Sequence, residues 1–140
     1  MIREARISDY EDIHHLCESD LGYICDKERV KLRLSTLDHS RECVFVADQE
    51  CTIVGFIHVE KYEVLYAPSM ANILGIAISE RFRRQGLGRQ LLAAAEEWAK
   101  SKEITLMRLN SGKTREEAHL FYRSMGYSDD KEQLRFIKAI

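Results

Sequence analysis

The sequence contains no long apolar run, no low-complexity tract and only one proline, Pro68. A transmembrane helix needs about 20 consecutive, mostly apolar residues, and no segment of this chain supplies them. Residues 1–6 also lack the apolar stretch of a secretory signal peptide. We therefore expect a cytoplasmic protein that has no membrane partner.

An excess of one charge is absent as well, because 21 basic side chains stand against 23 acidic ones and the formal net charge is -2. Nucleic-acid-binding domains usually carry a basic surplus, so we expect no nucleic-acid partner. The 140 residues, of which 45% are hydrophobic, suffice for one core and are too few for two ordinary domains. The sequence therefore predicts a single domain over residues 1–140.

The cysteines form no C-x-x-C pair and have no zinc-binding spacing with the neighbouring histidines. Disulfides are rare in cytosolic proteins. We therefore expect free thiols and no metal site. The four cysteines are Cys17, Cys25, Cys43 and Cys51.

The apolar periodicity predicts an α/β order in which two helices precede three segments rich in Val, Ile and Phe that are typical of an antiparallel meander. A helix, a strand, a helix and a strand follow. The predicted strands are residues 2–6, 43–47, 53–60, 71–79, 104–109 and 134–140. Four helices are predicted. The first begins at a capping box from Ser8 to Glu11, the second covers residues 27–37, and the third follows the glycines at 86 and 88. The fourth covers residues 114–125, with Thr114 and Glu117 as caps and Gly126 as the stop.

The most informative segment, residues 83–89, reads Arg-Arg-Gln-Gly-Leu-Gly-Arg between a predicted strand and a predicted helix. Glycines let backbone N–H groups approach an anion, and a helix N-terminus favours negative charge. The segment predicts a phosphate or pyrophosphate site, with a turn carrying solvated arginines as the alternative. A dinucleotide-binding motif would need glycine at Leu91, and a Walker A loop ending in residues 111–114 would need glycine at Met107, so both are disfavoured.

A second segment, residues 118–127, completes a pattern of two motifs. Arg83-x-x-Gly86-x-Gly88 together with Ala118-x-x-Phe121-Tyr122-x-x-x-Gly126-Tyr127 resembles the signature regions of the GNAT (Gcn5-related N-acetyltransferase) family. The resemblance implies an α/β fold with a mixed, mostly antiparallel central sheet of six to seven strands flanked by about four helices. It also implies direct transfer, in a ternary complex, of the acetyl group of the cosubstrate acetyl-CoA to a primary amine.

The resemblance further assigns the cosubstrate-binding residues. In that family the strand before the glycine-rich turn bulges and splays from its neighbour, and its main chain pairs with the cosubstrate, which here implicates Ile76, Ala77 and Ile78, with Gly75 as the bulge residue. The turn binds the pyrophosphate through backbone amides. The corresponding residues are Arg83, Arg84, Gln85, Gly86, Leu87, Gly88 and Arg89.

Three side chains are candidates for the chemistry. Tyr122 matches the family tyrosine that donates a proton or hydrogen bond to the departing thiolate, although its helical spacing alone is typical of a core residue. Many relatives carry a glutamate base on the bulged strand, where this chain has Asn72, which cannot accept a proton. His58 and Glu60 share one face of the adjacent predicted strand and are the alternative bases, directly or through water; a solvated polar face is the other interpretation.

The acceptor is less well defined. A small cationic amine, such as a polyamine or an aminoglycoside, would suit the acidic side chains of the first half. A protein N-terminus or lysine is the alternative acceptor, and an acetyl-CoA-binding regulatory module is the non-enzymatic alternative. Residues 134–140 would allow pairing in a homodimer. The acidic residues are Asp9, Asp12, Glu18, Asp20, Asp26, Glu28, Glu60 and Glu63.

Overall fold

The computed structural model describes all 140 residues, which form two compact units, Met1–Leu109 and Asn110–Ile140. The expectation of a single domain over residues 1–140 stays a prediction. None of the helices has the length and apolar character that crossing a bilayer requires.

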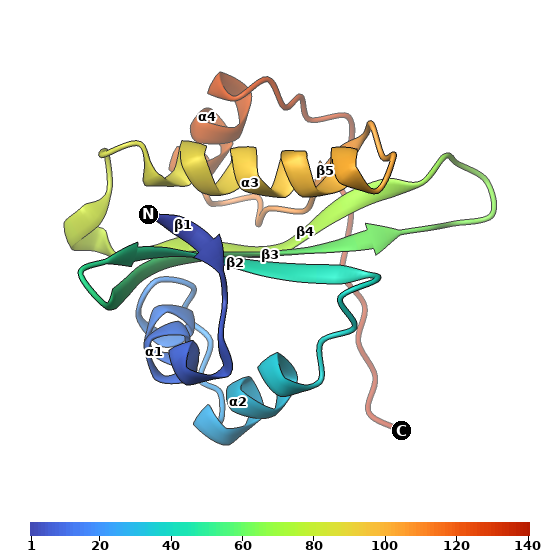
Figure 1. Ribbon diagram of the computed structural model, residues 1–140. Helices are drawn as coiled ribbons and strands as arrows, with labels where there is room; N and C mark the ends of the chain where they lie inside the picture. Colours follow the sequence, from blue (N-terminus) through green and yellow to red (C-terminus); the bar gives the residue numbers. More distant parts are fainter. The chain divides into compact units, whose positions relative to one another are not determined.

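The first unit is built on a five-stranded sheet in the order β1-β2-β3-β4-β5 (Figure 1). The first four strands are antiparallel neighbours, and β5 runs parallel to β4. The predicted mixed, mostly antiparallel sheet is therefore confirmed. The strands are β1 (Ile2–Glu4), β2 (Glu42–Gln49), β3 (Thr52–Tyr62), β4 (Met70–Ile78) and β5 (Met107–Leu109).

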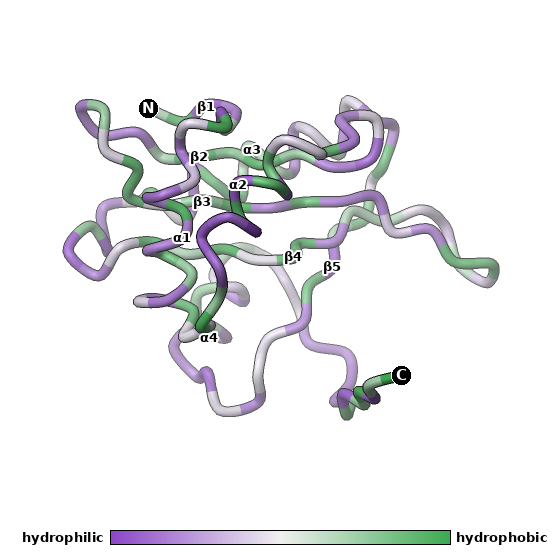
Figure 2. The backbone as a smooth tube through the Cα atoms, turned by 90° about the horizontal axis from the view of Figure 1, so that it is seen from below, coloured by the Kyte–Doolittle hydropathy of each residue, from purple (hydrophilic) through white to green (hydrophobic).

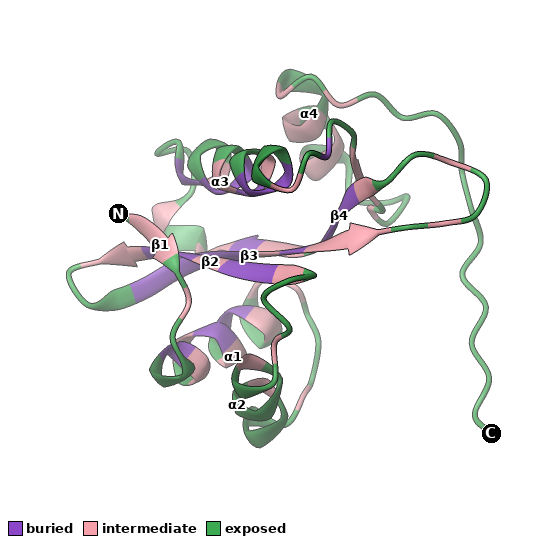
Figure 3. Ribbon diagram, turned by 45° about the vertical axis from the view of Figure 1, so that its right-hand side comes forward, coloured by how far each residue is buried: buried purple, intermediate pink, exposed green.

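Helices cover both faces of this sheet. α1 (Tyr10–Ser19) and α2 (Lys27–Ser35) lie on one face, and α3 (Leu87–Ser101) lies on the other (Figure 1). Short 3-10 turns, Ile7–Asp9 and Glu80–Phe82, precede α1 and the glycine-rich loop. Because the sheet is covered on both sides, its central strands are apolar at successive positions rather than at alternate ones, and residues 53–57 of β3 are all buried (Figure 3).

The second unit contains α4 (Glu116–Ser124), which is shorter than the predicted 114–125. The expected caps, Thr114 and Glu117, are not found, because Arg115 precedes the helix and no side chain caps it. Gly126 does stop the helix, with the left-handed φ of 91° that glycine adopts without strain.

The closing strand over residues 134–140 is not formed, so the expected sheet of six to seven strands is wrong. A strand exists only through hydrogen bonds to a neighbour, and residues 128–140 have no regular structure and are exposed throughout. Phe136 is 88% exposed and Ile140 is fully exposed. Figure 2 shows both hydrophobic and hydrophilic residues along this tail.

The start of α1 also differs from the sequence prediction. Ser8 lies inside the 3-10 turn and does not cap, so the box from Ser8 to Glu11 is wrong. Asp9 directly precedes α1, but its side chain caps no amide of that helix. Its carboxylate instead closes the 3-10 turn by accepting the Arg6 amide at 2.7 Å, and it accepts a two-pronged bond from Arg3 at 2.9 and 3.0 Å. Arg3 also donates to Asp48 of β2 at 3.0 Å, so one arginine joins β1, the turn before α1 and β2.

Asp9 makes the stability of the fold sensitive to acid. Burial alone would raise the pKa of the Asp9 carboxyl, but the hydrogen bonds from Arg3 and the Arg6 amide outweigh it and hold this pKa below its usual value. A carboxyl whose pKa is depressed in the folded state stabilises that state above its unfolded pKa, and the contribution is lost as the pH falls through the folded pKa.

We predict that Asp9→Asn lowers the free energy of unfolding at neutral pH by about 2 to 3 kcal/mol, the size of hydrogen bonds to a charged group. The wild type and the variant should converge as the pH falls from about 4 toward 2. Urea denaturation across this range measures both effects. Asp130→Asn, at an exposed position, serves as the control, and a difference between wild type and Asp9→Asn that stays constant with pH would contradict the assignment.

Candidate active site

The strand β4 carries an extra residue in the middle of its pairing with β3. Val59 lies opposite Ile73 and His58 lies opposite Gly75, which leaves Leu74 without a partner. The expected bulge is therefore present, but the extra residue is Leu74, which is 49% exposed, and not Gly75. Such a bulge bends the strand and ends regular pairing.

The pairing of β4 with β5 stops at the same place. It covers only residues 71–73 of β4, so the strand from Leu74 to Ile78 has β3 on one edge and no strand on the other. Ser79 donates to the Val54 carbonyl at 2.7 Å. Because antiparallel pairs alternate, the Ala77 amide also points toward β3, whereas the Ile76 and Ile78 amides point toward the free edge.

The glycine-rich loop follows this free edge directly. Arg84 and Gly86 have left-handed φ values of 64° and 81°, and α3 begins at Leu87. The first hydrogen bond within α3 runs from the Gln90 amide to the Gly86 carbonyl, so the amides of residues 87–89 have no partner inside the helix. This geometry presents several backbone donors to one point in solvent, which is how helix N-termini bind phosphate.

The arginines of the loop have different surroundings. Arg83 donates from Nε to the Ile78 carbonyl at 3.2 Å and from Nη2 to Asp20 at 3.1 Å, and the Asp20 side chain is only 8% exposed. Arg83 therefore joins the free β4 edge to the end of α1. Arg84 and Arg89 form no ion pair and are exposed, so their charges are available to an anion.

His58 of β3 faces α1 and α2 and lies beside a carboxylate. Its Nε2 is 2.7 Å from Oε1 of Glu42, on the neighbouring strand β2. A carboxylate can only accept, so Nε2 is the donor of this bond, and in the neutral imidazole Nδ1 is left to accept a proton. The side chains of His58 and Glu42 are 21% and 16% exposed. Glu42 was not among the residues predicted from the sequence; the register places it opposite Glu60.

Glu60, on the same face, belongs to a second polar group. Its Oε2 accepts from the Asn72 amide at 2.9 Å, and Asn72 Oδ1 accepts from Arg108 of β5 at 2.9 Å. The Arg108 guanidinium lies 4.1 Å from the centre of the Tyr62 ring. Asn72 is one of only two buried polar residues of the chain, and both ends of its amide are bonded.

Tyr122 lies in the second unit, on α4, with its ring near those of Phe121 and Tyr127 at centroid distances of 5.5 and 6.3 Å. Its hydroxyl has no hydrogen-bond partner. Burial raises the pKa of this hydroxyl above its ordinary value, and the nearby Arg115 opposes the shift only in part. Tyr122 is therefore protonated at neutral pH and can donate.

Most acidic side chains of the first half are bound within the chain, so they do not form a free anionic surface. Glu28 alone among those singled out above forms no hydrogen bond or ion pair through its carboxylate. The paired residues are Asp9 with Arg3, Asp12 with the Ile53 amide, Glu18 with His14, Asp20 with Arg83, Asp26 with the Glu28 amide, Glu60 with Asn72, and Glu63 with Arg41.

The fold agrees with comparisons to known proteins. The sequence model of the Acetyltransferase (GNAT) family matches residues 2–127. The chain therefore belongs to the GNAT family, and it is an acetyl-CoA-dependent N-acetyltransferase. The resemblance of the two sequence motifs is confirmed.

Individual relatives have the same class of activity in their names. An uncharacterized N-acetyltransferase of Chlorobaculum tepidum is 29% identical over 138 residues, covering 94% of this chain and 77% of the relative. The aminoalkylphosphonate N-acetyltransferase of Salmonella typhimurium is 33% identical over 89 residues, covering 63% of this chain and 56% of the relative. An aminoglycoside N-acetyltransferase, AAC(6')-Iy, solved in complex with CoA, shares the fold with a TM-score of 0.80, 20% identity and full coverage of both chains.

Asn72 connects three strands through its side chain, and its loss leaves two charged groups unpaired. We predict that Asn72→Ala lowers the free energy of unfolding by about 2 kcal/mol, because the Glu60 carboxylate and the Arg108 guanidinium each lose a partner. Thermal or urea denaturation measures this change. Asn110→Ala, at an exposed position, should change stability by less than about 0.5 kcal/mol; equal effects of the two substitutions would refute the role of the Asn72 network.

Proposed function

We propose that this chain acetylates the primary amine of a small molecule by direct transfer from acetyl-CoA in a ternary complex. The free edge of β4 supports this most strongly. A bulge at Leu74 and the short pairing with β5 leave the Ile76 and Ile78 amides without a strand partner, next to a glycine-rich helix N-terminus. One continuous surface thus offers donors for an extended chain and for a pyrophosphate.

The residues fit acetyl-CoA as follows. Main-chain groups of Ile76 and Ile78 would pair with the pantetheine arm and the acetyl carbonyl. The Ala77 amide points toward β3, so Ala77 would contribute by holding Ile76 and Ile78 in the strand. The amides of residues 84–89 would hold the pyrophosphate, with Arg84 and Arg89 adding charge. Arg83 would act by fixing the β4 edge, because its guanidinium already binds the Ile78 carbonyl and Asp20.

The chemistry needs a base for the amine and an acid for the sulfur. Acetyl-CoA supplies the acetyl group as a thioester, so a C–N bond forms, a C–S bond breaks, one proton leaves the amine and one reaches the thiolate. Tyr122 would donate the proton to sulfur. The amides at the β4 edge would stabilise the charge that develops on the acetyl oxygen.

His58 is the base that the geometry favours. The Glu42 carboxylate accepts the Nε2 hydrogen and orients the ring, so Nδ1 is left as a proton acceptor, an arrangement that enzymes use repeatedly. Glu60 is the alternative base. Its Oε2 is occupied by the Asn72 amide, and Oε1 remains to accept a proton directly or through water.

The function is tested by thiol release from acetyl-CoA in the presence of amines. Amine-dependent release, with mass-spectrometric detection of the acetylated amine, is the expected result. The panel includes polyamines, aminoglycosides, amino acids, aminoalkylphosphonates, and lysine-containing peptides with free N-termini. Turnover of peptides alone would show that the acceptor is a protein and not a small molecule. Binding of acetyl-CoA without thiol release in the presence of any amine would contradict the proposal.

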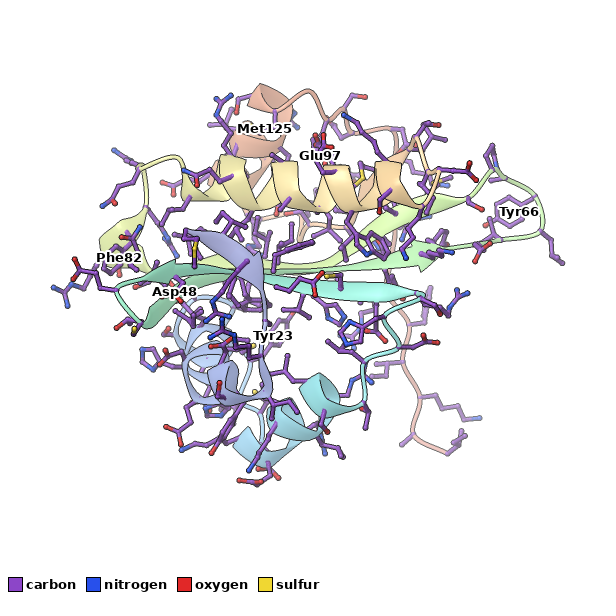
Figure 4. The ribbon with its side chains drawn as sticks, viewed as in Figure 1. Tyr23, Asp48, Tyr66, Phe82, Glu97 and Met125 are labelled. Carbon is purple, nitrogen blue, oxygen red and sulfur yellow. The ribbon has the colours of Figure 1, made fainter.

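Tyr122→Phe is expected to lower kcat by about a hundredfold, since positioned acids contribute about that much or more, while the affinity for acetyl-CoA stays within about twofold. Steady-state kinetics and calorimetric titration with acetyl-CoA in the absence of an amine measure the two quantities. Tyr66→Phe is the matched control, because Tyr66 is 86% exposed at the tip of the β3–β4 connection (Figure 4). Unchanged kcat in Tyr122→Phe would make Tyr122 a packing residue.

His58→Gln and Glu60→Gln separate the two bases. We predict that His58→Gln lowers kcat/KM by about a hundredfold or more. Glu60→Gln should lose less than about tenfold in rate. The reverse pattern of losses in kcat/KM would assign the base to Glu60.

A further inference from the structure

The helix α2 covers the sheet loosely. None of its residues is buried, and its apolar side chains Val30 and Leu34 are only partly buried against the core beneath them. A cavity of about 240 Å³ lies between α1, α2 and the strands β2 and β3. The pocket is open to solvent, since Arg29 and Arg33 along it are exposed, so a small molecule can enter it.

The cavity combines an apolar floor with positive charge. Val44 and Phe56 form the floor, and the guanidinium-bearing side chains of Arg29 and Arg33 line it from α2. The two arginines are four residues apart and share one face of the helix. His58 lines the cavity from β3.

This positive charge is only partly neutralised within the chain, through an ion pair between Arg33 and Glu42. Arg29 forms no hydrogen bond or ion pair. Arg33 approaches one carboxylate, Glu42 Oε1, at 3.7 Å, which is too long for a hydrogen bond, and that oxygen is already bonded to His58 at 2.7 Å. Two guanidinium groups therefore retain donors in the fork geometry that matches carboxylates and phosphonates.

The end of the cavity at His58 is close to the free edge of β4. His58 lies opposite Gly75, the residue that follows the Leu74 bulge, and neighbouring strands are about 4.8 Å apart. A ligand in the cavity whose amine lies beside His58 is thus one strand away from the Ile76 amide. A chain of a few atoms suffices to join that amine to a group bound by the arginines.

We infer that this cavity binds the acceptor, and that the acceptor carries an acidic group, a carboxylate or a phosphonate, on a short chain with its primary amine. The inference rests on the proposed transferase function. Arg29 and Arg33 bind the acid, the apolar floor contacts the chain, and His58 receives the amine. A polycation fits less well, because most carboxylates of this half of the chain already have partners.

Kinetics with matched amines test the inference. The probes are 2-aminoethylphosphonate and β-alanine, compared with propylamine and putrescine, which lack an acid. We expect wild type to prefer the acidic amines, and Arg29→Gln/Arg33→Gln to lower kcat/KM for them by about tenfold or more, as loss of a charge-assisted hydrogen bond does, with propylamine changed by less than about twofold. Lys31→Gln, which removes one positive charge from the same helix outside the cavity lining, should leave all four values unchanged.

Equal use of all four amines by the wild type, or an equal loss for all of them in the double variant, would overturn the acidic-acceptor inference while leaving the transferase intact. Absence of turnover with every amine of the larger panel would instead count against the proposed function. The two failures are therefore distinguishable by the same assay.

The rate of cysteine alkylation measures binding in the cavity without requiring turnover. Cys17 and Cys25 both line the cavity. Burial, with a smaller contribution from the neighbouring Cys25, raises the pKa of the Cys17 thiol to about 11, so Cys25 is the better reporter. Saturating 2-aminoethylphosphonate should slow alkylation of Cys25 by iodoacetamide about tenfold or more, as occupancy of a site at high saturation does, without affecting the exposed Cys51. Unchanged alkylation of Cys25 would contradict binding in the cavity.

Discussion

The interaction on which the structure depends is the pairing of β4, which is complete along one edge and brief along the other. β3 pairs with β4 from Met70 to Ile78, whereas β5 pairs with it over three residues only. The bulge at Leu74 marks the point where the second edge becomes free. A strand edge inside a sheet covered by helices on both faces is an unusual place for unpaired amides, and it is here that we place the cosubstrate.

The two faces of the sheet have different roles around this edge. On one face, α3 packs tightly through Leu91 and Leu92, which are fully buried, and this packing fixes the glycine-rich loop at its N-terminus. On the other face, α2 leaves a cavity that ends at His58. The rigid side suits a cosubstrate with a constant pyrophosphate, and the looser side is where we place the acceptor.

Local patterns in the sequence predicted the meander, α3 and the glycine-rich loop, because the periodicity of apolar residues and the spacing of glycines can be recognised within a few consecutive residues. They did not predict the Glu42–His58 pair, since its partners are 16 positions apart and meet only through strand register. The bulge was expected at Gly75 because glycine lacks a side chain. The register places it at Leu74 instead, because the position of a bulge depends on how the strand pairs with its neighbours. The strand over residues 134–140 was inferred from its apolar residues alone, and apolar character without a pairing partner does not make a strand.

The most direct test of this account is the exchange rate of three consecutive amides, measured by NMR in the free protein and with CoA. The account predicts that Ile76 and Ile78 exchange rapidly in the free protein and slow markedly when CoA binds, while Ala77, bonded to β3, is protected in both states. Equal protection of all three amides in the free protein, or no change on CoA binding, would contradict the claim that the free edge of β4 is the cosubstrate site.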